Sequence, residues 1–208
     1  MSGRARQQPW DQRIARRIAQ ALARTPVTPN LVTAFSMALC LAGAALFADG
    51  GRVAACWGAV LFAAGRFLDH CDGELARITG RRSRFGYYFD YAAGGIGYAA
   101  LFVGLALGAH RGWLDAWALA LGAAGAGAAL ISLFLNIGID RTGGAGADGD
   151  AVGYPAFAGF ELEDGIYLIV PIAWAGLVEP FFAAAGLGAT VYCAWTFRRL
   201  MRLRRRPG

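Results

Sequence analysis

The sequence predicts an all-α integral membrane protein, with six transmembrane helices and an N-terminal amphipathic helix at the membrane interface. Hydrophobic residues make up 57% of the 208 residues, only 16% are charged, and the mean hydropathy is +0.42. This composition is typical of a polytopic membrane protein and leaves no soluble domain of useful size. The 30 glycines suit close packing of helices in lipid. We therefore expect residues 1–208 to form a single membrane domain.

The charge distribution favours a membrane over a nucleic acid as the partner of the basic residues. The net charge is +6, and all 20 basic residues are arginines. Apolar stretches separate these arginines, so membrane lipids are the expected partner and no nucleic acid is. No signal peptide is evident, because a polar, arginine-rich stretch precedes the first apolar run. The four cysteines show no CxxC pairing and are interpreted as small core residues.

Residues 1–28 are expected to form a cytoplasmic or interfacial segment. Within it, four apolar residues recur at four-residue steps: Trp10, Ile14, Ile18 and Leu22. This spacing predicts an amphipathic helix that lies on the cytoplasmic leaflet, and a solvated basic tail is the alternative. Pro29 can then open the first membrane helix.

Six apolar stretches within residues 29–197 predict a bundle of six membrane spans. Their expected bounds are Pro29–Phe47, Val53–Ala76, Phe85–Ala109, Trp113–Ile139, Ile166–Val178 and Pro180–Phe197. The fifth stretch is short, so we expect it to tilt or to start deep in the membrane. A basic cytoplasmic tail, residues 198–208, follows the last span.

The arginines also predict the orientation of the bundle. They concentrate in the N-terminal segment, between residues 77 and 84, and in the tail, whereas the opposite loops hold only Arg52 and Arg111. The positive-inside rule therefore places both termini in the cytoplasm of a bacterial-type inner membrane. The connection between the second and third spans lies on the same side.

Acidic and small residues gather where the second span reaches the cytoplasm. On a helix, one face carries residues at i, i+3, i+4, i+7 and i+8: Asp69, Asp72, Gly73, Ala76 and Arg77. Asp90 lies on the next expected helix, so a third carboxylate can meet the first two across a helix hairpin. An acidic residue within apolar helices costs roughly 2.5 to 3.5 kcal/mol on insertion scales, so a cation must neutralise this cluster.

The chemistry of the cluster points to a divalent metal and a phosphate-bearing ligand. Three carboxylates suit Mg²⁺ or Mn²⁺, which also bind phosphates. Arg77 offers a fork of donors for phosphate oxygens. Gly73 and Ala76 leave room for a ligand to lie against the backbone.

This run resembles the signature of the CDP-alcohol phosphotransferases, integral membrane enzymes of phospholipid synthesis, at every position up to Asp90. The resemblance implies that a CDP-linked lipid, with CDP-diacylglycerol the expected donor, gives a substituted phosphoryl group to a small alcohol and releases CMP. It also implies a homodimer and a nucleotide pocket that Asn30 and Thr33 help to line. Asp90 would act in catalysis and would share the metal with two further ligands, Asp69 and Asp72.

The family pattern requires one more aspartate where this chain has Gly94. In the family that aspartate is thought to bind metal and to take the proton of the acceptor hydroxyl, and glycine can do neither. Four explanations are open: an inactive protein, an engineered change at this position, a metal-bound water or hydroxide as base, or a carboxylate from elsewhere. Glu161, Glu163 and Asp164 are the catalytic candidates for the last role, because their loop enters on the same membrane side. His70 is a weaker candidate, since it projects about 100° from the ligand face.

The sequence says less about the acceptor alcohol. Basic residues are scarce in the last three spans, which favours an uncharged or amino alcohol. Arg66 lies on the face of Asp69 and keeps a phosphorylated acceptor open, although an ion pair with the aspartates is its simpler role. The main alternative function is an impaired or non-catalytic membrane protein that binds CDP-lipid and divalent metal. A prenyltransferase or a transporter fits the spacing less well.

Overall fold

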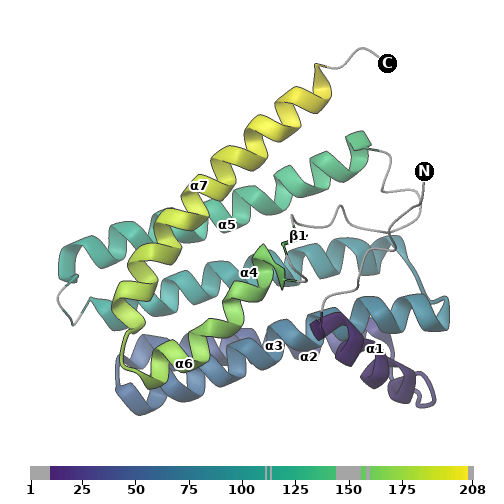
Figure 1. Ribbon diagram of the computed structural model, residues 1–208, viewed down its shortest axis with the longest axis horizontal. Coiled ribbons are helices and arrows are strands. Elements are labelled where there is room, and N and C mark those ends of the chain that lie inside the picture. Colours follow the sequence, from purple (N-terminus) through teal and green to yellow (C-terminus); the bar gives the residue numbers. More distant parts are fainter. Residues whose placement is uncertain (1–9, 111, 113, 144–155, 158–159, 206–208) are drawn as a thin grey trace.

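The computed structural model describes residues 10–110, 112, 114–143, 156–157 and 160–205, and almost all of them are helical (Figure 1). The helices are α1 Trp10–Leu22, α2 Pro29–Asp49, α3 Arg52–Thr79, α4 Arg84–Ala109, α5 Asp115–Gly143, α6 Ile169–Trp174 and α7 Val178–Arg204. A 3-10 segment, Leu162–Leu168, leads into α6. Two short strands, β1 Ala156–Phe157 and β2 Phe160–Glu161, pair antiparallel.

Local sequence signals set the ends of the helices that carry the acidic cluster. The Thr28 side chain caps α2 by accepting a hydrogen bond from the Leu31 amide, and Pro29 fills the first helical position. Gly50 ends α2 at φ 77°, and Gly80 ends α3 at φ 66°. These left-handed positions suit glycine, which lacks a Cβ. The Ser83 hydroxyl then caps α4, so α3 and α4 form a hairpin with a short connection.

Helix α2 lies between α3 and α4 and packs closely against both. A Cβ on Gly43 of α2 would lie 2.7 Å from the carbonyl oxygen of Gly58 in α3, and a Cβ on Gly104 of α4 would overlap the backbone of Ala44. Small residues therefore let the three backbones approach each other, as is common in membrane bundles. α3 and α4 contact each other little, and acidic residues from both helices line one cavity.

The remaining helices extend this layer. α5 packs against α4 and α7 packs against α5, while α6 lies against α3 and α7. Figure 1 shows the C-terminal half of α7 projecting beyond the rest of the bundle. The apolar core lies between α2, α3, α4 and α7 and contains large, fully buried side chains: Phe62, Leu101, Leu105 and Phe182.

Four helices are long and apolar enough to cross a membrane: Pro29–Asp49, Arg84–Ala109, Asp115–Thr142 and Val178–Arg204. The all-helical membrane fold is thus supported, but six spans are not. α3 covers the second expected stretch with 28 residues and carries charged residues in its C-terminal half. The expected fifth span is a shorter apolar segment, Gly165–Trp174, because Gly176 turns the chain at φ 77° and α7 begins at Val178.

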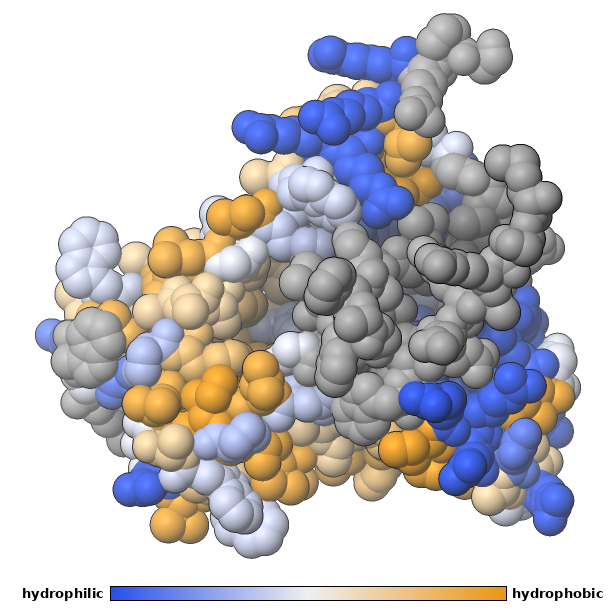
Figure 2. All heavy atoms as spheres, in the orientation of Figure 1, coloured by the Kyte–Doolittle hydropathy of each residue, from blue (hydrophilic) through white to orange (hydrophobic). Residues whose placement is uncertain are grey.

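Helix α1 agrees with the expected amphipathic segment in its bounds and in its exposed arginines. Two small residues, Ala15 and Ala19, are fully buried against Cys71 and Leu75 of α3. Ile14 and Ile18 from the expected apolar ladder remain more than a third exposed. Alanines rather than isoleucines therefore seat α1 on the bundle. Figure 2 shows hydrophilic side chains gathered near α1 and at the C-terminal end of α7.

Candidate metal centre and cavity

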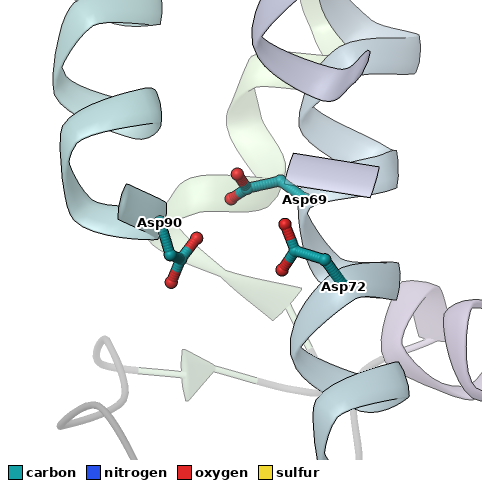
Figure 3. A group of neighbouring side chains, drawn as sticks. All are labelled: Asp69, Asp72 and Asp90. Carbon is teal, nitrogen blue, oxygen red and sulfur yellow. The ribbon is translucent and has the colours of Figure 1, made fainter. Parts of the chain in front are cut away.

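Three carboxylates converge where the cytoplasm-side ends of α3 and α4 are predicted to lie. Asp69, Asp72 and Asp90 each offer an oxygen, and these oxygens lie within 4.8 Å of one another. Figure 3 shows the first two projecting from α3 toward the third, which projects from α4. The helical spacing brings Asp69 and Asp72 to one face, and α2 holds the two helices at the distance that the cluster needs. The structure thus brings the three residues together, while their role as ligands stays a prediction.

The three carboxylates differ in their surroundings. Asp72 is only 4% exposed, Asp69 is half-buried, and Asp90 is exposed. The Thr33 hydroxyl lies 2.5 Å from Asp72 Oδ2 and donates a hydrogen bond to it. The prediction that Thr33 helps to line the nucleotide pocket stays a prediction, and the structure adds this contact with a carboxylate. Such hydrogen bonds hold a ligand oxygen in place before a metal arrives.

Arg66 lies beside the cluster as a buried cation. Its guanidinium is 3.0 Å from Asp69 Oδ2 and 4.9 Å from the ring centroid of Tyr98, and the residue is 5% exposed. A charged side chain within a membrane helix is costly unless it is paired, so both contacts help to retain it. A Cβ added to Gly94 would have Arg66 Nη1 as its neighbour, at 3.6 Å. A Cβ would therefore fit over Gly94, in van der Waals contact with a guanidinium.

Arg77 lies two turns beyond Asp69 on the same helix and lines the same cavity as the aspartates. It forms an ion pair of 2.6 Å with Glu74, and its guanidinium nitrogens lie 3.7 and 3.9 Å from where a Cβ on Gly73 would be. The Arg77 guanidinium therefore lies over Gly73, and both residues line the cavity. Ala76 is half-buried one turn further along. Asn30, on α2, places its Oδ1 close to Gly86 of α4.

A cavity of about 700 Å³ extends from the aspartates into the bundle. Gly73 and Arg77 line it together with the three carboxylates, whereas Ala76, Asn30 and Thr33 are not among the described residues that do so. Its volume is in the range of small-molecule sites.

The wall opposite α3 carries polar residues that the sequence analysis did not single out. They come from α5 and α7: Ser132, Asn136, Asp140, Tyr192 and Arg199. Asp140 is 2% exposed and accepts hydrogen bonds from Tyr91 and, at 3.0 Å, from Tyr87. Asn136 donates to the Tyr192 hydroxyl at 3.3 Å. The recurrence of Ser132, Asn136 and Asp140 at four-residue steps in an apolar stretch is the signal that could have revealed this wall.

The three carboxylates predicted as substitute bases fall outside the described side chains. Glu163 and Asp164 belong to the 3-10 segment, whose backbone is described, but the side chains of both residues and of Glu161 are not. His70 lines the cavity next to Asp69. The prediction that a carboxylate from this segment replaces the missing aspartate stays untested.

Comparison with known proteins shows which family has a similar sequence. The family model described as CDP-alcohol phosphatidyltransferase matches residues 26–193. Archaetidylinositol phosphate synthase of Pyrococcus horikoshii is 34% identical over 97 residues, which are 47% of this chain and 50% of that protein. Phosphatidylinositol phosphate synthase of Streptomyces avermitilis is 35% identical over 95 residues, 46% of this chain and 38% of that one. The matched part thus spans half or less of these curated relatives.

Solved structures resemble the whole chain. A crystal structure of Mycobacterium tuberculosis phosphatidylinositol phosphate synthase with CDP-DAG bound has a TM-score of 0.58 at 23% identity, and the match covers 90% of this chain and 94% of that chain. This likeness shows the fold. A structure of the same protein with manganese and citrate has a TM-score of 0.50 at 25% identity, covering 93% of this chain and 90% of that chain.

Proposed function

Because the chain belongs to the CDP-alcohol phosphatidyltransferase family, we propose that it transfers a phosphatidyl-type group from a CDP-linked lipid to an alcohol and releases CMP. The family expected from the spacing of Asp69 to Asp90 is thereby confirmed. The observation that carries the activity is the convergence of three carboxylates within 4.8 Å at the mouth of a cavity large enough for a substrate. Such a transfer is a step of phospholipid biosynthesis.

The residues at the centre fit a divalent metal of the Mg²⁺ or Mn²⁺ type. Three carboxylate oxygens can converge on one point, and the burial of Asp72 makes an unneutralised cluster unfavourable. When bound, such an ion neutralises negative charge on a diphosphate and on the leaving oxygen. The manganese in the solved M. tuberculosis relative supports this assignment. Asp69, Asp72 and Asp90 would hold the ion.

The chain's own residues position the donor around this centre. Thr33 fixes the orientation of Asp72, and Arg66 fixes that of Asp69. Arg77 can turn from Glu74 to donate to phosphate oxygens, across the gap that Gly73 leaves. Because phosphoryl transfer depends mainly on alignment and charge, this positioning is the protein's principal contribution. CDP-diacylglycerol is the proposed donor, as CDP-DAG is the ligand named in the relative's structure.

The proton of the alcohol must leave when the new bond to phosphorus forms. A side chain at position 94 cannot take it, since the residue is glycine. Glu163 and Asp164 are the protein's own candidates for the base that takes this proton, because their loop is predicted to enter on the same side of the membrane as the three aspartates. Replacing each by glutamine or asparagine and measuring the rate of CMP release tests them.

For the topology, we propose that α3 and the segment Gly165–Trp174 enter the membrane with the four long apolar helices. Residues 29–197 would then form the bundle, with residues 1–28, the tail 198–208 and the metal centre at the cytoplasm. The arginine distribution supports this orientation. Protease accessibility of terminal tags in inside-out and right-side-out vesicles tests it. Exposed small-residue and apolar faces support a homodimer, which cross-linking in membranes tests.

The activity is tested by incubating purified protein with labelled CDP-diacylglycerol, Mg²⁺ or Mn²⁺ and a panel of alcohols, and by following CMP. We expect metal-dependent CMP release that Asp72→Asn abolishes. Asp115→Asn is the matched control, because that carboxylate is exposed and is not among the described residues that line the cavity. If the wild type releases no CMP with any alcohol and Gly94→Asp does release it, the natural protein has lost its catalytic activity.

A further inference from the structure

A second cavity, of about 270 Å³, lies at the end of the bundle away from the aspartates. The ends of α2, α4 and α6 and the first turns of α3 and α7 surround it. Its described wall is apolar or glycine except for two charged residues, Arg52 and Glu179. Arg52 and Asp69 belong to the same helix, and their separation in sequence corresponds to roughly 25 Å along its axis. The second cavity is therefore distinct from the metal centre.

Arg52 brings a positive charge to this cavity without a negative partner. Its Nη2 donates a hydrogen bond of 2.9 Å to the carbonyl oxygen of Trp174, which is neutral. Its Cζ lies 3.9 Å from where a Cβ on Gly176 would be, so the guanidinium lies beside the turn between α6 and α7. Among the described residues, no carboxylate forms an ion pair with Arg52. Because a guanidinium has five N–H donors, the others can bind an anionic group of a ligand.

Glu179 brings the opposite charge, and it too lacks a partner. Its Oε2 is buried and has no hydrogen-bond partner among the residues that the structure describes. A Cβ on Gly112 would overlap the carboxylate, so Glu179 packs against the connection between α4 and α5. A buried charged acceptor without a donor is destabilising. A ligand cation that donates hydrogen bonds would remove this destabilisation.

The surroundings of the cavity are those of a membrane interface. Large apolar side chains near its charged residues stay more than half exposed: Val53, Trp57, Trp174 and Leu177. Tryptophan side chains commonly lie at the level of lipid headgroups. A lipid whose headgroup enters the cavity can therefore lay its acyl chains along these side chains.

We propose that this cavity binds the headgroup of a zwitterionic phospholipid that carries a primary ammonium, in the leaflet opposite the metal centre. The lipid phosphate accepts hydrogen bonds from Arg52, and the ammonium donates to Glu179. One headgroup thereby neutralises two charges that no described residue neutralises. A quaternary ammonium has no N–H to donate, and an anionic headgroup without an amine has no cation, so both leave Glu179 unpaired. This binding does not depend on the transferase activity.

Lipid titration tests the binding and its selectivity. The full-length protein, purified in detergent and freed of lipid, is titrated with phosphatidylethanolamine, phosphatidylcholine or phosphatidylglycerol, and native mass spectrometry counts the bound lipids. We expect one phosphatidylethanolamine per chain, bound about 10- to 100-fold more tightly than the other two, because a hydrogen bond to a charged group is gained. Equal affinities for the three lipids would overturn the proposal.

Variants of the two charged residues assign the contacts. Glu179→Gln should erase the preference for phosphatidylethanolamine, whereas Arg52→Gln should weaken the binding of all three phospholipids. Asp115→Asn and Arg24→Gln are the matched controls, because both side chains are exposed and neither is among the described residues that line this cavity. An undiminished preference in Glu179→Gln would remove this carboxylate from the site and overturn the proposal.

Thermal unfolding separates lipid binding from a purely structural role of Glu179. Without lipid, Glu179→Gln should unfold at the same temperature as the wild type or higher, because a buried unpaired charge is removed. Phosphatidylethanolamine should raise the midpoint of the wild type more than that of the variant. If the variant is less stable by the same amount with and without lipid, Glu179 serves the fold alone and the proposal is wrong.

A change of shape with both charges kept gives a further test, which holds even if Arg52→Gln does not fold. Val178→Phe enlarges a half-buried side chain on the cavity wall, so it should abolish the selective binding of phosphatidylethanolamine. Binding at the affinity of the wild type would place the lipid elsewhere. Soluble phosphoethanolamine forms the last arm. If it raises the midpoint as much as the lipid does at the same concentration, the acyl chains contribute nothing and the assignment to a lipid is overturned.

Discussion

The two walls of the cavity are assembled in different ways. On the α3 wall, the two aspartates and Arg77 lie within nine residues of one helix, and the helical repeat alone places them on one face. The opposite wall joins α4, α5 and α7, and its residues lie far apart in the sequence: Tyr91, Ser132, Asp140, Tyr192 and Arg199. The residues of the α3 wall thus depend on one helix for their arrangement, while the opposite wall depends on how several helices pack.

The largest expected effect lies on the α3 wall. Asp72→Asn should lower the rate of CMP release by about 10³-fold or more, because a ligand to the ion that stabilises transition-state charge is lost. Isothermal titration of Mg²⁺ or Mn²⁺ should show weaker binding in the same variant. Asp115→Asn should change neither quantity. Unchanged metal binding in Asp72→Asn would remove this carboxylate from the centre.

A smaller effect on metal affinity or activity is expected at Thr33 of α2, which contacts the α3 wall through Asp72. Thr33→Val removes the hydroxyl that donates to Asp72, and loss of such a partner typically costs about 10- to 100-fold in metal affinity or activity. The Thr33 hydroxyl also lies 3.1 Å from the carbonyl oxygen of Pro29, four residues earlier. Thr190→Val is a close control, since the Thr190 hydroxyl donates to the carbonyl of Gly186, likewise four residues earlier, and no bond to a carboxylate is described for it. If both variants lose the same activity, the effect of Thr33 comes from helix packing and not from Asp72.

Substitutions on the wall formed by α4, α5 and α7 should lower the free energy of unfolding more than they change the rate of CMP release. Tyr91→Phe removes a donor to the buried Asp140 carboxylate, so we expect a loss of about 1.5–3 kcal/mol in the free energy of unfolding. Tyr88→Phe should cost less than about 1 kcal/mol, because its partner Arg141 is exposed. Thermal or denaturant unfolding in detergent measures both. Equal losses would show that Asp140 does not depend on Tyr91.

The contrast between the walls also explains what could be predicted from the sequence. The spacing from Asp69 to Asp90 predicted the carboxylate cluster. The helical repeat places Asp69 and Asp72 on one face, and the short connection between α3 and α4 brings Asp90 to them. The sequence could not show that Thr33 bonds Asp72, since that contact depends on how closely α2 approaches α3 through Gly43 and Gly58. Arg199 and Tyr192 were missed for the same reason, as their position depends on how α7 packs against α5.

The span count shows a related limit. Hydropathy identified α2, α4, α5 and α7, which are apolar along most of their length. It could not place the boundary at Gly176, where a left-handed turn separates the short α6 from α7. α3 is intermediate, because its first half is apolar and its second half carries the charged residues that the centre requires. The expectation from the sequence that α3 is the second span therefore stays a prediction.

The smallest expected effect comes from a substitution on the wall opposite α3, at Ser132. The Ser132 hydroxyl is buried on the cavity wall and has no hydrogen-bond partner among the described residues. Ser132→Ala should therefore leave the free energy of unfolding unchanged or slightly higher, because no hydrogen bond is lost and a buried polar group is removed. If the hydroxyl binds the acceptor, the KM for the alcohol should rise by up to about tenfold while the KM for CDP-diacylglycerol stays the same, as one hydrogen bond is worth about 0.5–1.5 kcal/mol. A rise in both constants would place Ser132 on the donor's path and would divide the cavity differently from the two walls described above.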